Sequence, residues 1–304
     1  MRKVWLLIAA MALVGTPARA GHIESYVIPA EPQREFPADF ELPVDAQARG
    51  ELYSWTDPRV GGWGGRFEGA EVCPDGHELR APVVLVHGTS EDAYAAWRAS
   101  DNGSTTVNVR QRLLDAGWCP EELWAISYTG GRGYFTYNDV NVDELHAFIQ
   151  NVRAYTGADR VDVVAHSLGV TVVRKAMRVH GYEWLRRFVA IGGANHGTTT
   201  CRGVGQVRGS HVCEELEPDS PTFTNAWLAD LNSIGETPPG PEYLVIYDSV
   251  GDQFYQGPDA HSPRLDGACN LDLPGRFHLP IARGPEAVAV YGAFLADGSL
   301  PVCS

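Results

Sequence analysis

The feature that most constrains the fold of this chain is a series of short apolar runs separated by helical patterns. Such runs, apolar without alternation, are typical of strands buried on both faces of a sheet. They occupy residues 82–86, 123–128, 161–165, 188–191 and 243–247, with a weaker candidate at 269–273. Between them, apolar residues recur at helical steps over 109–116, 143–155, 170–179 and 286–295. This order predicts an α/β fold with a mostly parallel sheet and helices on both faces.

The N-terminus has the pattern of a secretory signal peptide. Arg2 and Lys3 precede an apolar run from residue 4 to 14, and Ala18-Arg19-Ala20 offers a small-residue cleavage site. The run is shorter than the roughly 20 residues that span a bilayer. An uncleaved anchor is the alternative, but the cleavage triplet favours removal of residues 1–20 and export.

The rest of the chain divides into an extension and one large domain. Residues 21–80 are rich in Pro, Gly and Trp and show no period, so we expect an irregular extension packed on the core. Residues 81–304 form the predicted catalytic domain. Its pattern lapses around 198–240, an insertion that follows a strand, where active-site loops lie in open α/β sheets.

Charge excludes several classes of partner. The chain has a net charge of −14, and the segment 1–20 removes cations but no acids. Binding to nucleic acid needs Lys and Arg, so nucleic acid is not an expected partner. No other stretch is long and apolar enough for a stable membrane anchor, and we expect a monomer.

Six cysteines remain after the leader: Cys73, Cys119, Cys201, Cys213, Cys269 and Cys303. None is spaced as Cys-x-x-Cys, and an even number in an exported chain favours disulfides over metal binding or free thiols. The short loop favours Cys201–Cys213, and Cys269–Cys303 could hold the C-terminus. Cys73–Cys119 is then the third pair, although sequence alone does not decide the pairing.

The strongest local motif is Ala165-His166-Ser167-Leu168-Gly169. A buried strand enters it and a helix leaves it, which is the context of a nucleophile elbow that presents a strained serine above the sheet. Small flanking residues let strand and helix approach, and Ala165 stands where glycine is usual. The alternative is an ordinary turn in which Ser167 caps the helix.

An elbow needs main-chain N–H groups that bind an oxyanion. We expect these from Leu168, at the start of the helix, and from Thr89, in the loop after the strand that ends at His87. His87, His166 and His196 are candidates for the pocket lining. The position of His87, at the end of a buried strand, favours a role in shaping the loop. For His196, pocket lining and loop anchoring both stay open.

The remaining triad partners should follow as an acid and then a histidine. Asp248 and Asp252 both come after the run 243–247, and Asp252 is preferred because Asp248 lies too close to the strand end. His278 follows the last weak strand and can reach back across the sheet. His261 is its competitor but precedes that strand.

These blocks together resemble the bacterial class 2 lipases of the α/β-hydrolase superfamily. The resemblance covers 82–296 and rests on the run ending at His87-Gly88, the elbow, the turn 192–195 and the stretches 246–252 and 265–268 with His278. It implies Ser167, Asp252 and His278 as the triad. The lipase-like extracellular polyhydroxybutyrate depolymerases are a close alternative. The extension, the insertion and the cysteines depart from the pattern and leave substrate choice open.

The expected activity is therefore hydrolysis of carboxylic esters through an acyl-enzyme, with no cofactor and no metal, since no acidic cluster has calcium-ligand spacing. The substrate could be a lipid, a soluble ester or an insoluble polyester. A non-catalytic secreted binding protein on the same fold is the rival of another class. Several aromatic residues could adsorb to an insoluble substrate or pack the extension: Trp55, Trp63, Tyr134, Phe135 and Tyr137.

Overall fold

The computed structural model describes residues 34–43, 61–69, 72–89, 91–99, 106–128, 137–203 and 211–303. The predicted signal peptide 1–20 and the aromatic residues Trp55, Tyr134 and Phe135 lie outside these ranges. Within them, an eight-stranded sheet has the order β1-β2-β4-β3-β5-β6-β7-β8. This is the predicted α/β architecture.

Six neighbouring strands of the sheet are parallel. They are β3 (Val83–Val86), β4 (Leu123–Ser127), β5 (Val161–His166), β6 (Leu185–Ile191), β7 (Glu242–Tyr247) and β8 (Cys269–Asp272). Because parallel strands share one direction, their carboxyl ends meet at one edge of the sheet. The loops that follow β3, β5, β7 and β8 therefore converge there.

The extension does more than pack irregularly on the core, because it adds two strands to the sheet. β1 (Arg34–Glu35) pairs parallel with β2 (Gly61–Gly64), and β2 pairs antiparallel with β4. The sequence Gly-Gly-Trp-Gly lacks the pattern of a strand, yet a Cβ on Gly62 would lie 2.1 Å from the carbonyl oxygen of Ala125. Only glycine allows this approach. Trp63 is wholly buried, so it packs the extension and is not exposed for adsorption.

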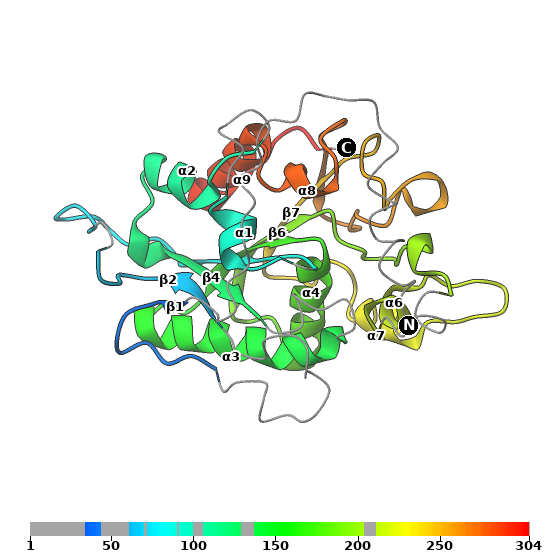
Figure 1. Ribbon diagram of the computed structural model, residues 1–304, viewed down its shortest axis with the longest axis horizontal. Helices are drawn as coiled ribbons and strands as arrows, with labels where there is room; N and C mark the ends of the chain where they lie inside the picture. The colour runs from blue at the N-terminus through cyan, green and yellow to red at the C-terminus, as the bar shows by residue number, and fades with distance from the viewer. Residues whose placement is uncertain are drawn as a thin grey trace, which may run out of the picture.

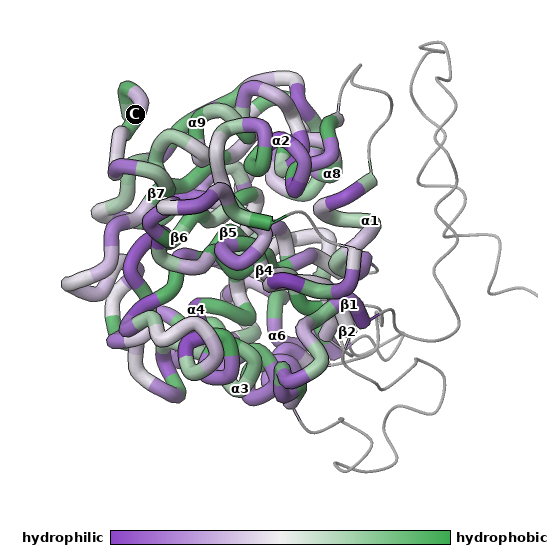
Figure 2. The backbone as a smooth tube through the Cα atoms, turned by 90° about the vertical axis from the view of Figure 1, so that its left-hand side faces the viewer, coloured by the Kyte–Doolittle hydropathy of each residue, from purple (hydrophilic) through white to green (hydrophobic). Residues whose placement is uncertain are grey.

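Helices cover both faces of the sheet (Figures 1 and 2). One face carries α3 (Asn138–Thr156) and α4 (Leu168–His180), and α3 begins five residues before the predicted start. The other carries α1 (Ala93–Trp97), α2 (Val109–Asp115) and α9 (Pro285–Asp297). Side chains of β5 alternate between the two cores that result, with Val163 and Ala165 in one and Val164 in the other.

The insertion 198–240 is partly helical. It contains α6 (His211–Leu216) and α7 (Ala226–Leu231), whose apolar residues join the core on the α3 and α4 face. Tyr137, at the N-cap of α3, stacks on His211 and donates its hydroxyl to Glu214 at 3.0 Å. Tyr137 thus packs against the insertion.

All six cysteines form disulfides, and the pairs are the three favoured by sequence: Cys73–Cys119, Cys201–Cys213 and Cys269–Cys303. The first links the extension to the segment before β4, and the second closes the base of the insertion. The third attaches the C-terminal tail to β8. Within the described part of the chain, no helix has the length and apolar character needed to cross a membrane.

Candidate active site

The turn between β5 and α4 has the geometry of a nucleophile elbow. Ser167 has φ 55° and ψ −124°, a conformation that L residues rarely adopt and that costs of order 1–3 kcal/mol. Gly169 is required by close packing, because a Cβ there would lie 2.6 Å from the carbonyl oxygen of His87. The main-chain N–H of Ser167 donates to the Ile191 carbonyl at 2.8 Å, which holds the turn against β6.

Ser167, His278 and Asp252 lie in hydrogen-bonding contact, although they come from three separate loops. His278 Nδ1 lies 2.7 Å from Asp252 Oδ2, and His278 Nε2 lies 2.8 Å from Ser167 Oγ. Because an ionised carboxylate only accepts hydrogen bonds, the imidazole proton belongs on Nδ1. Nε2 then carries the lone pair that can accept the serine proton. Asp252 and His278 are almost wholly buried.

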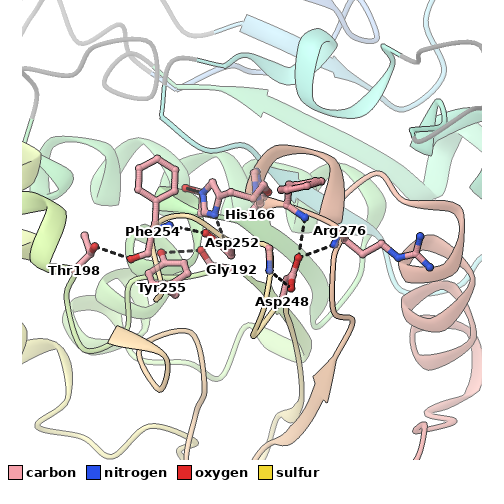
Figure 3. A network of polar contacts seen from close by, with 12 residues as sticks. His166, Gly192, Thr198, Asp248, Asp252, Phe254, Tyr255 and Arg276 are labelled. Carbon is pink, nitrogen blue, oxygen red and sulfur yellow. Dashed lines mark hydrogen bonds and ion pairs between the residues drawn. The ribbon is translucent and has the colours of Figure 1, made fainter. Parts of the chain in front are cut away.

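Asp248, the other candidate acid, holds main chain instead of the imidazole. Its carboxylate accepts N–H bonds from residues 250, 251, 275, 276 and 277, at 2.6 to 2.9 Å. Burial opposes its ionisation, but these N–H groups outweigh burial and lower the pKa of Asp248. In Figure 3 Asp248 is directed to the main chain beside Arg276, whereas Asp252 lies among Phe254, Tyr255 and Gly192.

Strain is found on both sides of the contact between Ser167 and His278. Among the described residues, only Ser167 and Phe277 are non-glycine residues with positive φ. Phe277 has φ 62° and directly precedes His278, and Asp248 binds its N–H at 2.8 Å. Such conformations persist where surrounding contacts impose them, and they gather at functional sites. Asp248 therefore fixes the loop that presents the imidazole.

Aromatic side chains enclose the imidazole of His278. The ring of Phe254 meets it edge-on with centroids 4.7 Å apart, and the ring of Tyr255 lies at 5.8 Å. Tyr255 is itself held by a hydrogen bond from its hydroxyl to the Gly192 carbonyl at 3.0 Å. Burial lowers the pKa of His278, and the hydrogen bond to Asp252 opposes this only in part. The imidazole therefore stays neutral, and able to accept a proton, down to a pH below the ordinary pKa of a histidine.

The two segments expected to supply oxyanion donors lie against the nucleophile. Leu168 is the first residue of α4, directly after Ser167. The Gly88–Thr89 segment is equally close, since a Cβ on Gly88 would lie 2.9 Å from the Cβ of Ser167. Main-chain N–H groups at such a helix start can bind a developing negative charge.

The three histidines proposed for a pocket lining are held in hydrogen bonds or packed inside. His87 and His166 are buried, and His87 stacks on Tyr128 at a centroid distance of 4.3 Å. The ring Nε2 of His196 lies 2.7 Å from Glu236 Oε1, and the main-chain N–H of His196 donates to Ser262 Oγ. His87 and His166 are thus internal, and the contacts of His196 join the insertion, at Glu236, to the loop after β7, at Ser262.

Three further residues lie around the triad and its neighbour His166: Glu91, Phe254 and Tyr255. Glu91 contacts His166 from the loop after β3, and the two aromatic residues follow Asp252 in the chain. Nothing in the local pattern marks them. His261, the competing base, is exposed and packs near His196, with ring centroids 5.1 Å apart.

Two clusters of side chains in the described ranges are compact enough to consider for a metal ion. They are Cys73, Cys119 and Glu121, and His77, Cys119 and Glu122. Both include Cys119, whose sulfur is bonded to Cys73. Neither cluster can therefore offer the thiolate that would make it a metal site.

In a comparison with protein families, residues 80–259 match the model of the family described as "Lipase (class 2)". The match covers more than half of the chain and includes Ser167 and Asp252, whereas His278 lies beyond it.

Two solved structures of lipases have the same fold as this chain. The mature lipase BlEst2 of Bacillus licheniformis aligns with a TM-score of 0.56 and 16% identity, over 74% of this chain and 96% of that one. Lipase B of Aspergillus fumigatus aligns with a TM-score of 0.51 and 13% identity, over 86% of this chain and 64% of the other. At these identities the alignments show the shared α/β-hydrolase fold.

Proposed function

Because the chain belongs to the class 2 lipase family and is a carboxylic ester hydrolase, we propose that it works by two-step acyl transfer with Ser167, His278 and Asp252 as the triad. The observation that supports this most strongly is the chain of contacts from Asp252 through the imidazole to Ser167 Oγ. The serine at its end has the strained conformation of an elbow.

In the first step His278 Nε2 takes the proton of Ser167 as the hydroxyl oxygen attacks the ester carbonyl. Asp252 keeps the imidazole in the required tautomer and stabilises the imidazolium. The N–H groups of Leu168 and Thr89 bind the oxyanion. The alcohol leaves with the proton from His278, and a water molecule activated by the same imidazole then hydrolyses the acyl-enzyme.

Export is part of the proposal. The leader pattern of residues 1–20 and the three disulfides both fit an oxidising compartment outside the cytosol. The expected mature protein starts after Ala20.

We propose a lipid ester as the substrate class. Apolar side chains next to the acid and the base are exposed: Val250 by 67%, Phe277 by 59% and Leu279 by 51%. Grouped on the two loops that carry the acid and the base, they provide an apolar rim that an aggregated ester can contact. An insoluble polyester would meet the same rim and is the second candidate substrate.

The test compares the purified chain with Ser167→Ala on chromogenic esters of several acyl lengths and on an emulsified triglyceride and a polyhydroxyalkanoate film. We expect the variant to lose at least about 10⁴-fold in kcat, as when a triad nucleophile is removed. Thermal melting of both proteins is the control, and it should differ little, since alanine fits the buried turn.

Equal activity of the two proteins would mean that another residue is the nucleophile. A parent that folds yet hydrolyses none of these esters would support the non-catalytic binding protein. Faster hydrolysis of the polyhydroxyalkanoate film than of the emulsified triglyceride would make a polyester, and not a lipid ester, the proposed substrate.

A further inference from the structure

A buried acid and histidine join the loops that carry the proposed nucleophile, oxyanion donors and base. His166 directly precedes Ser167 and is only 1% exposed. Its Nε2 lies 2.9 Å from the main-chain carbonyl oxygen of His278. Since a carbonyl only accepts hydrogen bonds, Nε2 of His166 must carry a proton. Figure 3 shows His166 next to the residues around Asp252.

The other ring nitrogen of His166 faces a carboxylate. Its Nδ1 lies 3.4 Å from Glu91 Oε2, and the N–H of Gly88 donates to the same oxygen at 3.4 Å. Burial opposes ionisation of Glu91, but the hydrogen bond and charge of His166, with the charges of Arg283 and His87, outweigh it and lower the pKa of Glu91 to about 2. A lone pair on Nδ1 would repel this carboxylate, so the contact is favourable when Nδ1 also carries a proton.

We propose that His166 and Glu91 form an imidazolium–carboxylate pair that positions His278, by holding its main-chain carbonyl and by keeping a fixed positive charge beside its ring. The rings of His166 and His278 have centroids 5.1 Å apart. This inference rests on the proposed triad, and it makes His166 and Glu91 positioning residues, because neither contacts the reacting atoms.

The charge has a consequence that a merely structural contact would lack. The charged groups that face His278 are His166 from the end of β5, Glu91 from the loop after β3 and Asp252 from the loop after β7. The cation opposes protonation of His278, whereas the two carboxylates favour it. If a neutral residue replaces His166, the cation is lost and only the two carboxylates act on His278. The pKa of His278 should therefore rise.

The surroundings of Glu91 include Arg283, His87 and the hydroxyl of Tyr128. Tyr128 donates to the His87 carbonyl at 2.5 Å, and burial raises its pKa far above the usual value. It therefore stays neutral across the pH range in which His278 titrates.

The experiment measures kcat and kcat/KM against pH on a soluble chromogenic ester for the full chain, His166→Gln and Glu91→Gln. Glutamine keeps an N–H donor near the position of Nε2 but carries no charge. The matched control is His180→Gln, which removes an imidazole from a contact with a carboxylate, that of Asp143, at the C-terminal end of α4.

We expect His166→Gln to move the acid limb of kcat/KM to higher pH and to lower kcat about ten- to a hundredfold, as for a small displacement of a catalytic group. His180→Gln should leave both unchanged. Nitrogen NMR of the histidine-labelled parent should show both ring nitrogens of His166 protonated at neutral pH, and in Glu91→Gln one of these protons should be lost.

An acid limb and a kcat of His166→Gln equal to those of the parent would overturn the proposal, as would a neutral His166 in the parent spectrum. If His166→Gln fails to fold, the spectra of the parent and of Glu91→Gln decide. A parent without esterase activity contradicts the proposed function instead, and the spectra still report the charge of His166.

Discussion

The two ends of β5 each carry a buried ionisable side chain, but the surroundings of the two differ. At the start of the strand, Asp162 is wholly buried and Arg186 of β6 binds it with two hydrogen bonds, at 2.8 and 2.5 Å. At the other end, His166 and Ser167 contact groups from the loops after β3 and β8. One strand thus joins a fixed ion pair to a site where protons are expected to move.

The partners explain this difference. Arg186 keeps its charge at any ordinary pH, and its side chain is 34% exposed, so one end of the pair reaches water. His278 is enclosed by Phe254 and Tyr255, and its ordinary titration range lies near neutral pH. An ion pair of constant charge thus has one partner exposed to water, whereas the imidazole whose charge must change is enclosed by aromatic side chains.

The largest effect should come from Asp252→Asn, which keeps the shape of the side chain but removes the acceptor that fixes the imidazole tautomer. We expect kcat to fall by roughly 10⁴-fold, with a melting temperature close to that of the parent. Kinetics and thermal melting on the same preparation test this. Asp162→Asn, at the other end of the strand, is the control and should keep kcat.

If Asp252→Asn loses activity because its melting temperature falls, Asp252 is a structural residue like Asp162, and the two ends of β5 do not differ in role.

The next largest effect should be on stability, from Arg186→Met. This variant leaves Asp162 buried without its partner, which costs about 3–5 kcal/mol of unfolding free energy. Asp162→Asn should cost much less, because the exposed end of Arg186 can turn to water. Urea unfolding measures both, and kcat per folded molecule should be unchanged.

The cost of Arg186→Met should depend on pH in a direction that can be stated. Burial raises the pKa of Asp162 even with Arg186 present. Loss of the arginine raises it further, so the folded state keeps a proton that the unfolded state releases. The deficit should therefore be small at low pH and grow as pH rises above the ordinary range of an aspartate. A deficit that is constant with pH would show that the carboxylate is not the cause.

The smallest effect should come from Phe254→Ala, which opens the enclosure of His278 to water. The burial that lowers the pKa of His278 is reduced, so this pKa should rise toward its ordinary value. The acid limb of kcat/KM should move to higher pH by less than one unit, which is under about tenfold at a given pH. Val179→Ala, exposed near the C-terminal end of α4, is the matched control. A limb that stays in place would show that the ring is not what desolvates the imidazole.

Much of the fold follows from local pattern. The runs around Val84, Val163 and Val245 are apolar on both faces, and each became a strand of the parallel sheet. β2 was missed because Gly61–Gly64 has neither alternation nor β-branched residues, and its pairing with β4 depends on a partner far along the chain. A local pattern cannot report such a contact.

The sequence alone indicates the six parallel strands, the helices α2, α3, α4 and α9, the elbow around Ser167 and the kinds of side chain available after each strand. It also favours Asp252 over Asp248 as the acid and His278 over His261 as the base, from their positions after the strands. Only the tertiary structure placed Asp252 on the imidazole, Asp248 on the main chain before it and Glu91 beside His166. The reason is that these roles depend on side-chain direction and on contacts between residues far apart in the chain, 75 residues for Glu91 and His166. No local regularity of the sequence records which groups will meet.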